Sequence, residues 1–203
     1  MIGTHLRCVA IAFAALVLSA CASRRPKPVP ADAATLAAQA QREATLAAQG
    51  DWTLRGRLGV SDGRDSGSGT LEWNQHGAAY RFSLHAPVTG KTWVLSGDDA
   101  NARLDGLRAQ PVLDADAAGL LLRELGWHVP VAQLRYWARG MRAAPTARIA
   151  FGPDGLPAEI EEDGWTIRYP AFDLAATPPL PLKVFAEKGP YRVRLAISSW
   201  SAQ

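Results

Sequence analysis

The sequence predicts a mainly β protein with some α structure, in which an antiparallel meander curls into a barrel or half-barrel. Residues 52–104 and 148–199 alternate apolar and polar side chains with the period of two that is typical of half-buried strands. Between them lie two segments with the apolar spacing of amphipathic helices. Helices inserted midway along a curled sheet can cover its open mouth.

Residues 1–20 predict a lipoprotein signal peptide. A basic start at Arg7 precedes an apolar run from Cys8 to Leu18, which is shorter than the roughly 20 residues of a membrane span. The run ends in Leu18-Ser19-Ala20-Cys21, a lipobox in which two small residues precede an obligatory cysteine. We expect cleavage before Cys21, an S-diacylglyceryl group on its thiol and an N-palmitoyl group on its new terminus. A secretory signal with a chance cysteine is the weaker alternative.

The residues that follow predict a tether and one folded domain. Residues 21–31 carry the lipidated Cys21 and a Pro-rich, basic, extended spacer, and residues 32–203 have the size of a single domain. Ala22 rather than Asp follows the cysteine, which favours the outer membrane. The chain has two cysteines, and Cys8 leaves with the signal, so we expect neither a disulfide nor a thiolate metal site.

The first half of the domain predicts one helix and five strands. Residues 32–49 are rich in Ala and Gln and predict a helix that ends at Gly50. Strands are expected at 52–60, 71–74, 80–84, 93–95 and 102–104, with a Gly/Ser/Asp turn at 62–69.

The second half predicts two helices and then five more strands, about ten in all. Residues 114–126 form an amphipathic helix that Asp114 or Asp116 caps and Gly126 ends, and a shorter helix at 131–139 ends at Gly140. Strands at 148–152, 157–162 and 165–169 lead through a Pro-rich loop at 174–181 to a hairpin of 183–186 and 191–199.

Composition and motifs give no sign of catalysis or of nucleic-acid binding. Basic and acidic residues nearly balance, 22 against 19. The chain contains no G-x-S-x-G elbow, no H-E-x-x-H helix and no phosphate loop. Single histidines beside turns and two acidic pairs predict solvent-facing side chains: His76, His85, His128, Asp98-Asp99 and Glu161-Glu162. We therefore expect no enzyme, no metal site and no cofactor beyond the lipid on Cys21.

Seven tryptophans are the unusual feature of the composition. Large rings on strand and helix faces can fill a solid core or line a cavity for an apolar ligand. The residues that could line such a cavity are Trp73, Trp93, Trp137 and Trp165. Composition alone favours the packed core, so both interpretations stay open at this point.

An ordered set of motifs resembles the LolB family of outer-membrane lipoprotein receptors. It covers nearly the whole mature chain and includes Trp52-x-x-x-Gly56-Arg57-x-Gly59, Gly69-x-Leu71-x-Trp73-x-Gln75, Pro87-Val88-x-Gly90, Leu125-Gly126, Val129-Pro130-Val131, Leu134-Arg135-Tyr136-Trp137-Ala138-Arg139-Gly140, Gly164-Trp165-x-Ile167-x-Tyr169, Leu180-Pro181 and Arg194-Leu195-x-Ile197-x-x-Trp200. The lipobox agrees, because LolB is itself lipidated whereas the related carrier LolA is not.

The resemblance implies an incomplete antiparallel barrel with a helical lid over an apolar cavity. It implies a receptor that accepts lipoproteins from LolA and places their acyl chains in the outer membrane without nucleotide. Trp73, Trp137 and Trp165 match family positions associated with the cavity, and Trp93, Leu121 and Leu134 complete the predicted lining.

The resemblance also implies a membrane contact and a location. An apolar residue in a protruding loop inserts into the bilayer in this family, and here that residue is Val88, between Pro87 and Gly90. We expect a monomer that is lipid-anchored on the periplasmic face of the outer membrane. The alternatives are a lipocalin-like binder of another lipid and a structural lipoprotein with a solid core.

Overall fold

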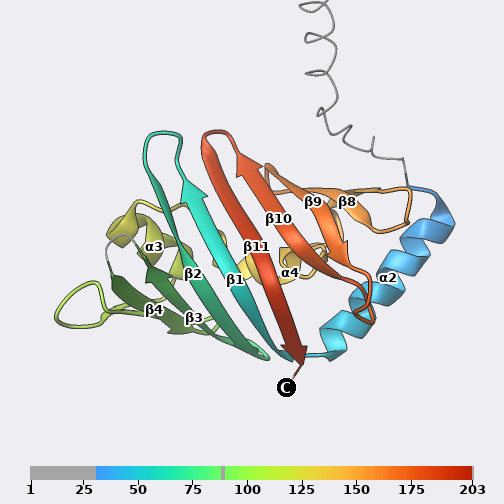
Figure 1. The fold of residues 1–203 in the computed structure, drawn as a ribbon. Helices are drawn as coiled ribbons and strands as arrows, with labels where there is room; N and C mark the ends of the chain where they lie inside the picture. Colours follow the sequence, from blue (N-terminus) through green and yellow to red (C-terminus); the bar gives the residue numbers. More distant parts are fainter. Residues whose placement is uncertain (1–30, 88–89, 203) are drawn as a thin grey trace, which may run out of the picture.

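The computed structural model describes residues 31–87 and 90–202, which form one curved antiparallel sheet with three helices (Figure 1). The strand order is β6-β5-β4-β3-β2-β1-β11-β10-β9-β8-β7. The elements are α2 (Ala33–Ala48), β1 (Asp51–Ser61), β2 (Ser66–His76), β3 (Ala79–Ala86), β4 (Lys91–Gly97), β5 (Ala102–Asp105), β6 (Val112–Asp114), α3 (Ala117–Leu125), α4 (Val131–Trp137), β7 (Arg148–Phe151), β8 (Pro157–Glu162), β9 (Trp165–Asp173), β10 (Leu180–Lys188) and β11 (Tyr191–Ala202).

The sheet is open, which is the half-barrel that the resemblance implied rather than the closed barrel that the residue pattern also allowed. Its edge strands β6 and β7 are not paired with each other, and the chain between them forms α3 and α4. Both helices lie on the face that the curved sheet encloses, behind the strands in Figure 1. The half-barrel with an inserted helical lid and an N-terminal helix is therefore confirmed. In the described residues, no helix combines the length and the apolar character that crossing a membrane requires.

The centre of the sheet joins the two ends of the domain, because β1 pairs with both β2 and β11. The register between β1 and β11 shifts between Arg55 and Gly56, which marks a β-bulge. A Cβ atom at Gly56 would lie 2.3 Å from the carbonyl oxygen of Ala196. Glycine is therefore required at this position, where the backbone of β11 lies against β1.

The enclosed face of the sheet carries the core. Side chains at every second position are buried in β1, β2, β9 and β11, in agreement with the predicted alternation. Among the largest fully buried side chains are Leu54, Trp73, Leu95, Trp137, Ile160 and Ile167.

Helix α3 begins and ends with the caps that the sequence indicates. The Asp116 carboxylate accepts hydrogen bonds from the backbone N–H groups of Ala118 and Gly119 at 3.0 and 2.9 Å. Gly126 ends the helix in the left-handed conformation, with φ of 69°.

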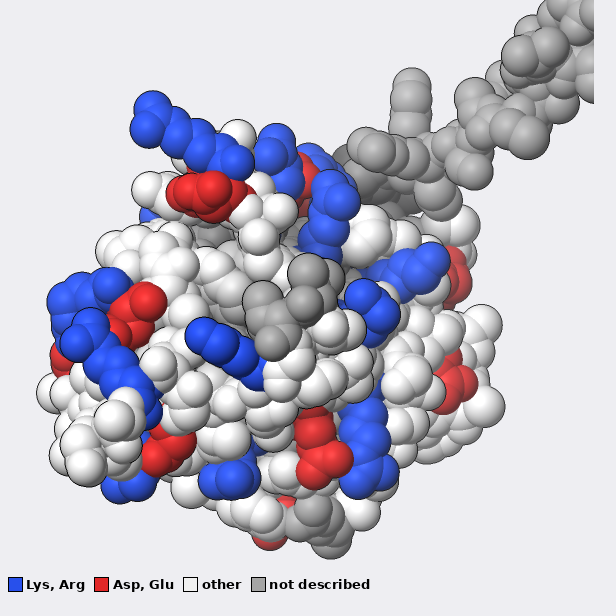
Figure 2. All heavy atoms as spheres, turned by 60° about the vertical axis from the view of Figure 1, so that its left-hand side comes forward, with Lys and Arg blue, Asp and Glu red and all other residues white. Residues whose placement is uncertain are grey.

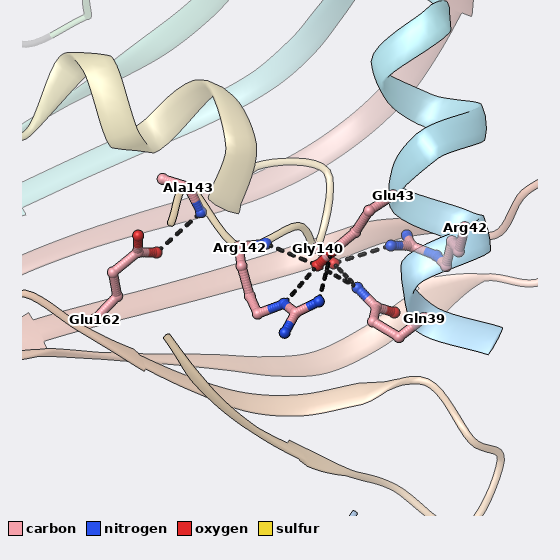
Figure 3. Close-up of polar contacts among 7 residues, drawn as sticks. All are labelled: Gln39, Arg42, Glu43, Gly140, Arg142, Ala143 and Glu162. Atoms are coloured by element: carbon pink, nitrogen blue, oxygen red, sulfur yellow. Dashed lines mark hydrogen bonds and ion pairs between the residues drawn. The ribbon is translucent and has the colours of Figure 1, made fainter. Parts of the chain in front are cut away.

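Helix α2 docks against the segment after α4 mainly through polar side chains (Figure 3). The buried Arg42 guanidinium donates to the carbonyl oxygens of Arg139, Gly140 and Pro179 at 2.8, 2.9 and 2.7 Å. Burial lowers the pKa of Arg42 to about 10. Two of the three carbonyls belong to the turn that follows α4, so α2 holds the end of this lid helix in place.

An ion pair strengthens the same contact. Arg142 donates to the two carboxylate oxygens of Glu43 at 3.0 and 2.8 Å, and its backbone N–H donates to the same carboxylate at 3.0 Å. Burial raises the pKa of Glu43, but hydrogen bonds from Arg142 and Gln39 outweigh it and leave the pKa below its usual value. The carboxylate is thus charged in the folded protein at neutral pH.

The structure corrects the predicted secondary structure at several points. The described residues contain eleven strands rather than about ten, because Val112–Asp114 pairs with β5. The segment 66–69, predicted as turn, is the start of β2, paired with β1. The predicted loop at 174–181 is shorter, since β10 begins at Leu180.

Candidate functional site

A cavity of about 400 Å³ lies between the enclosed face of the sheet and the lid. Trp73, Phe82 and Trp165 line it from the strands, and Val129 and Val131 line it from the lid. The cavity lies in the size range of roughly 300–1,000 Å³ in which proteins bind small ligands. The described structure therefore contains a hollow with a mostly apolar surface and several charged lining residues, rather than a completely packed interior.

Trp73 forms the strand side of this cavity and is held in place by polar and aromatic contacts. Its indole Nε1 donates to the Oε1 atom of the buried Gln75 at 2.9 Å. Its ring lies 4.3 Å from that of Phe82 and 4.8 Å from that of Trp52, measured between centroids. The side chain is fully buried, so its orientation is fixed by packing.

Trp165 lines the opposite part of the cavity, next to a histidine whose environment the sequence did not indicate. The ring of His128 stacks on Trp165 at 5.8 Å with an interplanar angle of 8°, and lies 4.5 Å from that of Tyr191. The expectation of a solvated His128 was wrong, because the residue lines the cavity and is partly buried among aromatic rings.

The other four predicted lining residues are buried in the same core but do not line this cavity. Trp93 contacts Trp127, with ring centroids 5.4 Å apart. Trp137, Leu121 and Leu134 are at most 3% exposed and hold the lid helices against the sheet. That these four side chains bind acyl chains stays a prediction, because the lid would have to rearrange before a ligand could reach them.

Glu162 is the polar residue that sequence reasoning misplaced. It is 6% exposed, and its Oε2 atom accepts from the Trp137 indole at 2.8 Å and from the Ala143 backbone at 3.0 Å. The expectation of a solvent-facing pair was therefore wrong for Glu162, whereas Glu161 forms an exposed ion pair with Arg148. Both partners of Glu162 lie about twenty residues upstream, so local sequence carries no signal of the contact.

Charged groups surround the mouth of the cavity. Arg135 of α4 pairs with Asp99 in the β4–β5 turn at 2.9 Å, and the Lys188 ammonium donates to the carbonyl oxygen of Asp163 at 2.7 Å. Tyr80 lines the cavity, and burial, together with Asp98, raises the pKa of its hydroxyl to about 12. The phenol is therefore neutral at physiological pH.

A second cavity of about 280 Å³ adjoins the first. Trp52, Tyr136, Arg139 and Met141 belong to this cavity alone. Three residues line both cavities and form the wall between them: Gln75, Asp99 and Arg135.

The remaining predicted site residues lie at the β3–β4 turn and in the leader. Pro87 and Gly90 are exposed at this turn, and the Gly90 N–H donates to the carbonyl oxygen of Ala86 at 2.9 Å. Val88 and Cys21 lie outside the described residues. Over residues 31–87 and 90–202, no group of three His, Cys, Asp or Glu side chains could hold a metal ion. Figure 2 shows side chains of both charges scattered over one face, with uncharged areas between them.

An open antiparallel sheet that encloses an apolar cavity under inserted helices defines a class, the LolA-type half-barrels. The fold is similar to that of a LolA superfamily protein from Nitrosomonas europaea, with a TM-score of 0.51 at 12% identity, covering 81% of this chain and 94% of that one. At this identity the likeness concerns the fold alone.

Sequence comparison specifies the family within that class. The family model for the outer membrane lipoprotein LolB matches residues 50–200. The outer-membrane lipoprotein LolB of Xanthomonas campestris pv. campestris strain B100 is 42% identical over 172 residues, covering 81% of this chain and 78% of the relative. That of Xylella fastidiosa strain 9a5c is 33% identical over 180 residues, covering 87% and 83%. The chain belongs to the LolB family: it is an outer-membrane lipoprotein with a LolB-type role in lipoprotein handling, as the motifs implied.

Proposed function

We propose that this protein accepts lipoproteins from the periplasmic carrier LolA and places their acyl chains in the outer membrane, as a monomer, with no nucleotide and no catalytic step. The supporting observation is the apolar cavity under α3 and α4. Each acyl methylene hidden from water is worth about 0.8 kcal/mol. Direct transfer from one apolar cavity to another avoids the cost of exposing the chains to water, and direction requires only that affinity rise from LolA to this protein to the bilayer.

The lid must open for this transfer, because a lipoprotein with three acyl chains needs more room than the present cavity offers. Helix α3 buries Leu120 and Leu121 in the core. Its polar contacts are ion pairs of mostly exposed arginines, Arg108 with Glu124 and Arg123 with Asp114. Such pairs contribute about 0–1 kcal/mol each. The end of α4 is instead held by the buried contacts of Arg42. In this proposal α3 moves and α4 stays in place.

The proposal places the membrane anchor at Cys21. An N-palmitoyl and an S-diacylglyceryl group there would hold the protein at the periplasmic face of the outer membrane, with residues 21–31 as the spacer and 32–203 as the receptor domain. Two lipid attachments on one residue suffice for stable anchoring, whereas a single chain binds reversibly.

The proposal places the membrane-inserting contact at the β3–β4 turn, where the exposed Pro87 and Gly90 flank Val88. We expect Val88→Glu to retain lipoprotein binding but to lose incorporation of lipoproteins into membranes, because a charge at the tip opposes entry into hydrocarbon. Val88→Leu is the matched control and should incorporate lipoproteins at least as well as the parent. Normal incorporation by Val88→Glu would refute the role of this loop.

The decisive experiment measures transfer of a labelled lipoprotein from LolA to this protein. Ala132→Trp, at an exposed position of α4 that lines the cavity, should reduce acceptance. Ala44→Trp, exposed on α2 and lining neither cavity, should accept normally. Absence of transfer to the parent protein overturns the proposal. Mass spectrometry of co-purified lipid distinguishes the lipocalin-like alternative, which would carry free fatty acid or glycolipid instead of acylated peptide.

A further inference from the structure

Arg139 gives the second cavity a buried positive charge that no carboxylate neutralises among the described residues. The residue is 6% exposed, and its two hydrogen bonds go to the backbone and side-chain oxygens of Gln49 at 3.1 and 3.4 Å. A guanidinium has five N–H donors, so these contacts leave donor capacity at the cavity wall. Its face lies against the ring of Trp52, at 5.6 Å from the centroid.

The surroundings of this guanidinium are electropositive. Burial, and secondarily the charge of Arg42, lowers the pKa of Arg139 to about 10, so the group is charged at neutral pH and gains from a nearby acceptor. Among the described residues that line this cavity, the one carboxylate, Asp99, is paired with Arg135. The amide of Gln75 is engaged with Trp73 and Gly77. Arg139 thus offers a ligand a charged donor that no carboxylate of the described residues engages.

Part of the wall between the two cavities is an ion pair that water can reach. The Arg135–Asp99 pair spans this wall, and the Asp99 side chain is 60% exposed, so water competes for the pair. The ring contact between Trp52 and Trp73, at 4.8 Å, continues the aromatic surface from the first cavity into the second. One extended molecule can therefore occupy both.

We propose that the second cavity binds the oxygen-bearing end of an acyl lipid, an ester carbonyl or carboxylate, on Arg139 while the hydrocarbon chain lies in the first cavity. The inference rests on the proposed function, which requires only that the first cavity hold acyl chains. It adds a polar subsite that orients the chain, because Arg139 donates hydrogen bonds and the oxygens of an ester or carboxylate accept them.

The test compares three ligands of equal chain length, delivered in cyclodextrin to the full protein: palmitate, methyl palmitate and hexadecane. Charge-assisted hydrogen bonds predict that the oxygen-bearing ligands bind at least about tenfold more tightly than hexadecane. Ala47→Trp, at an exposed α2 position that lines only the second cavity, should abolish the preference and keep hexadecane binding. Arg139→Gln should do the same, with retained hexadecane binding showing that it folds. Ala44→Trp is the matched control and should behave as the parent.

The outcomes separate this inference from the function on which it rests. A preference for both oxygen-bearing ligands supports an ester-type subsite, and a preference for palmitate alone supports a carboxylate subsite. Equal affinity for all three ligands, or a preference for oxygen-bearing ligands that persists in Ala47→Trp, overturns the polar subsite. In either case, binding of hexadecane still supports the acyl-chain cavity on which the receptor function rests. If none of the three ligands binds, the polar subsite and the acyl cavity both fail.

Discussion

Replacing Arg42 by Met tests whether polar contacts hold the N-terminal helix to the lid. The substitution removes the hydrogen bonds to the carbonyls of Arg139, Gly140 and Pro179, at 2.7–2.9 Å, and keeps most of the apolar stem. Each hydrogen bond to a charged group is worth about 1.5–3 kcal/mol. The loss of these hydrogen bonds is partly offset, because the variant no longer has to bury a guanidinium. We expect a net loss of about 3–4 kcal/mol in the free energy of unfolding.

The assay is urea unfolding followed by tryptophan fluorescence, with Arg55→Met as the matched control. Arg55 also forms an ion pair, with Glu72 at 2.9 Å, but its side chain is 62% exposed, so its loss should cost less than about 1 kcal/mol. With a slope of about 2 kcal/mol per molar urea, Arg42→Met lowers the midpoint by about 1.5–2 M. Equal, small shifts for both variants would refute the view that buried arginine contacts hold α2.

Three further substitutions test other contacts. Gly56→Ala should destabilise the protein by about 1–3 kcal/mol, because the added Cβ would meet the backbone of β11. In the control Gly59→Ala the added Cβ meets open space, so the free energy of unfolding should change by less than about 0.5 kcal/mol. Equal shifts of the unfolding midpoint in the two variants would contradict this reasoning. Because the pKa of Glu43 is depressed on folding, its pair with Arg142 stabilises the protein above the ordinary value of 4.5 and is lost as pH falls through the folded pKa. Glu43→Gln should therefore be less stable than the parent at pH 7, with a gap that narrows in strong acid; a gap that does not change between pH 7 and pH 3 would count against the pair. Tyr80→Phe removes a buried hydroxyl for which the described residues provide no hydrogen-bond partner, and it should stabilise the protein by about 1 kcal/mol. A clear loss of stability in the melting curve would instead show that the hydroxyl donates a hydrogen bond in the folded protein.

The architecture could be predicted because its determinants are local. Alternation in β1 and β9 and the capping residues Asp116 and Gly126 each report on their own element. The Gly/Ser run at 66–69 was wrongly predicted as a turn, because glycine is common in turns. Here it is needed for close approach, since a Cβ at Gly69 would lie 2.5 Å from the carbonyl oxygen of His85.

The site was harder to predict because its contacts join distant parts of the chain. Trp73 and Trp165 meet the cavity from opposite halves of the sheet, and alternation alone does not say which buried ring faces a hollow. Glu162 looked exposed because its partner Trp137 lies on another element. Arg139 had no sequence signal beyond its place in the helix-ending motif, and only the fold brings it to Gln49 and the second cavity.

The pairing of β1 with β11 makes the middle of the sheet depend on two strands that lie at opposite ends of the described domain. The strands on either side, β1 to β6 and β7 to β11, each pair in sequential order. The pairing of β1 with β11, however, joins residues more than 130 positions apart, such as Trp52 and Ala202. Closing so long a loop is slow, and it is impossible until β11 is available. A chain that is threaded through a membrane amino terminus first therefore cannot complete this sheet until β11 has crossed.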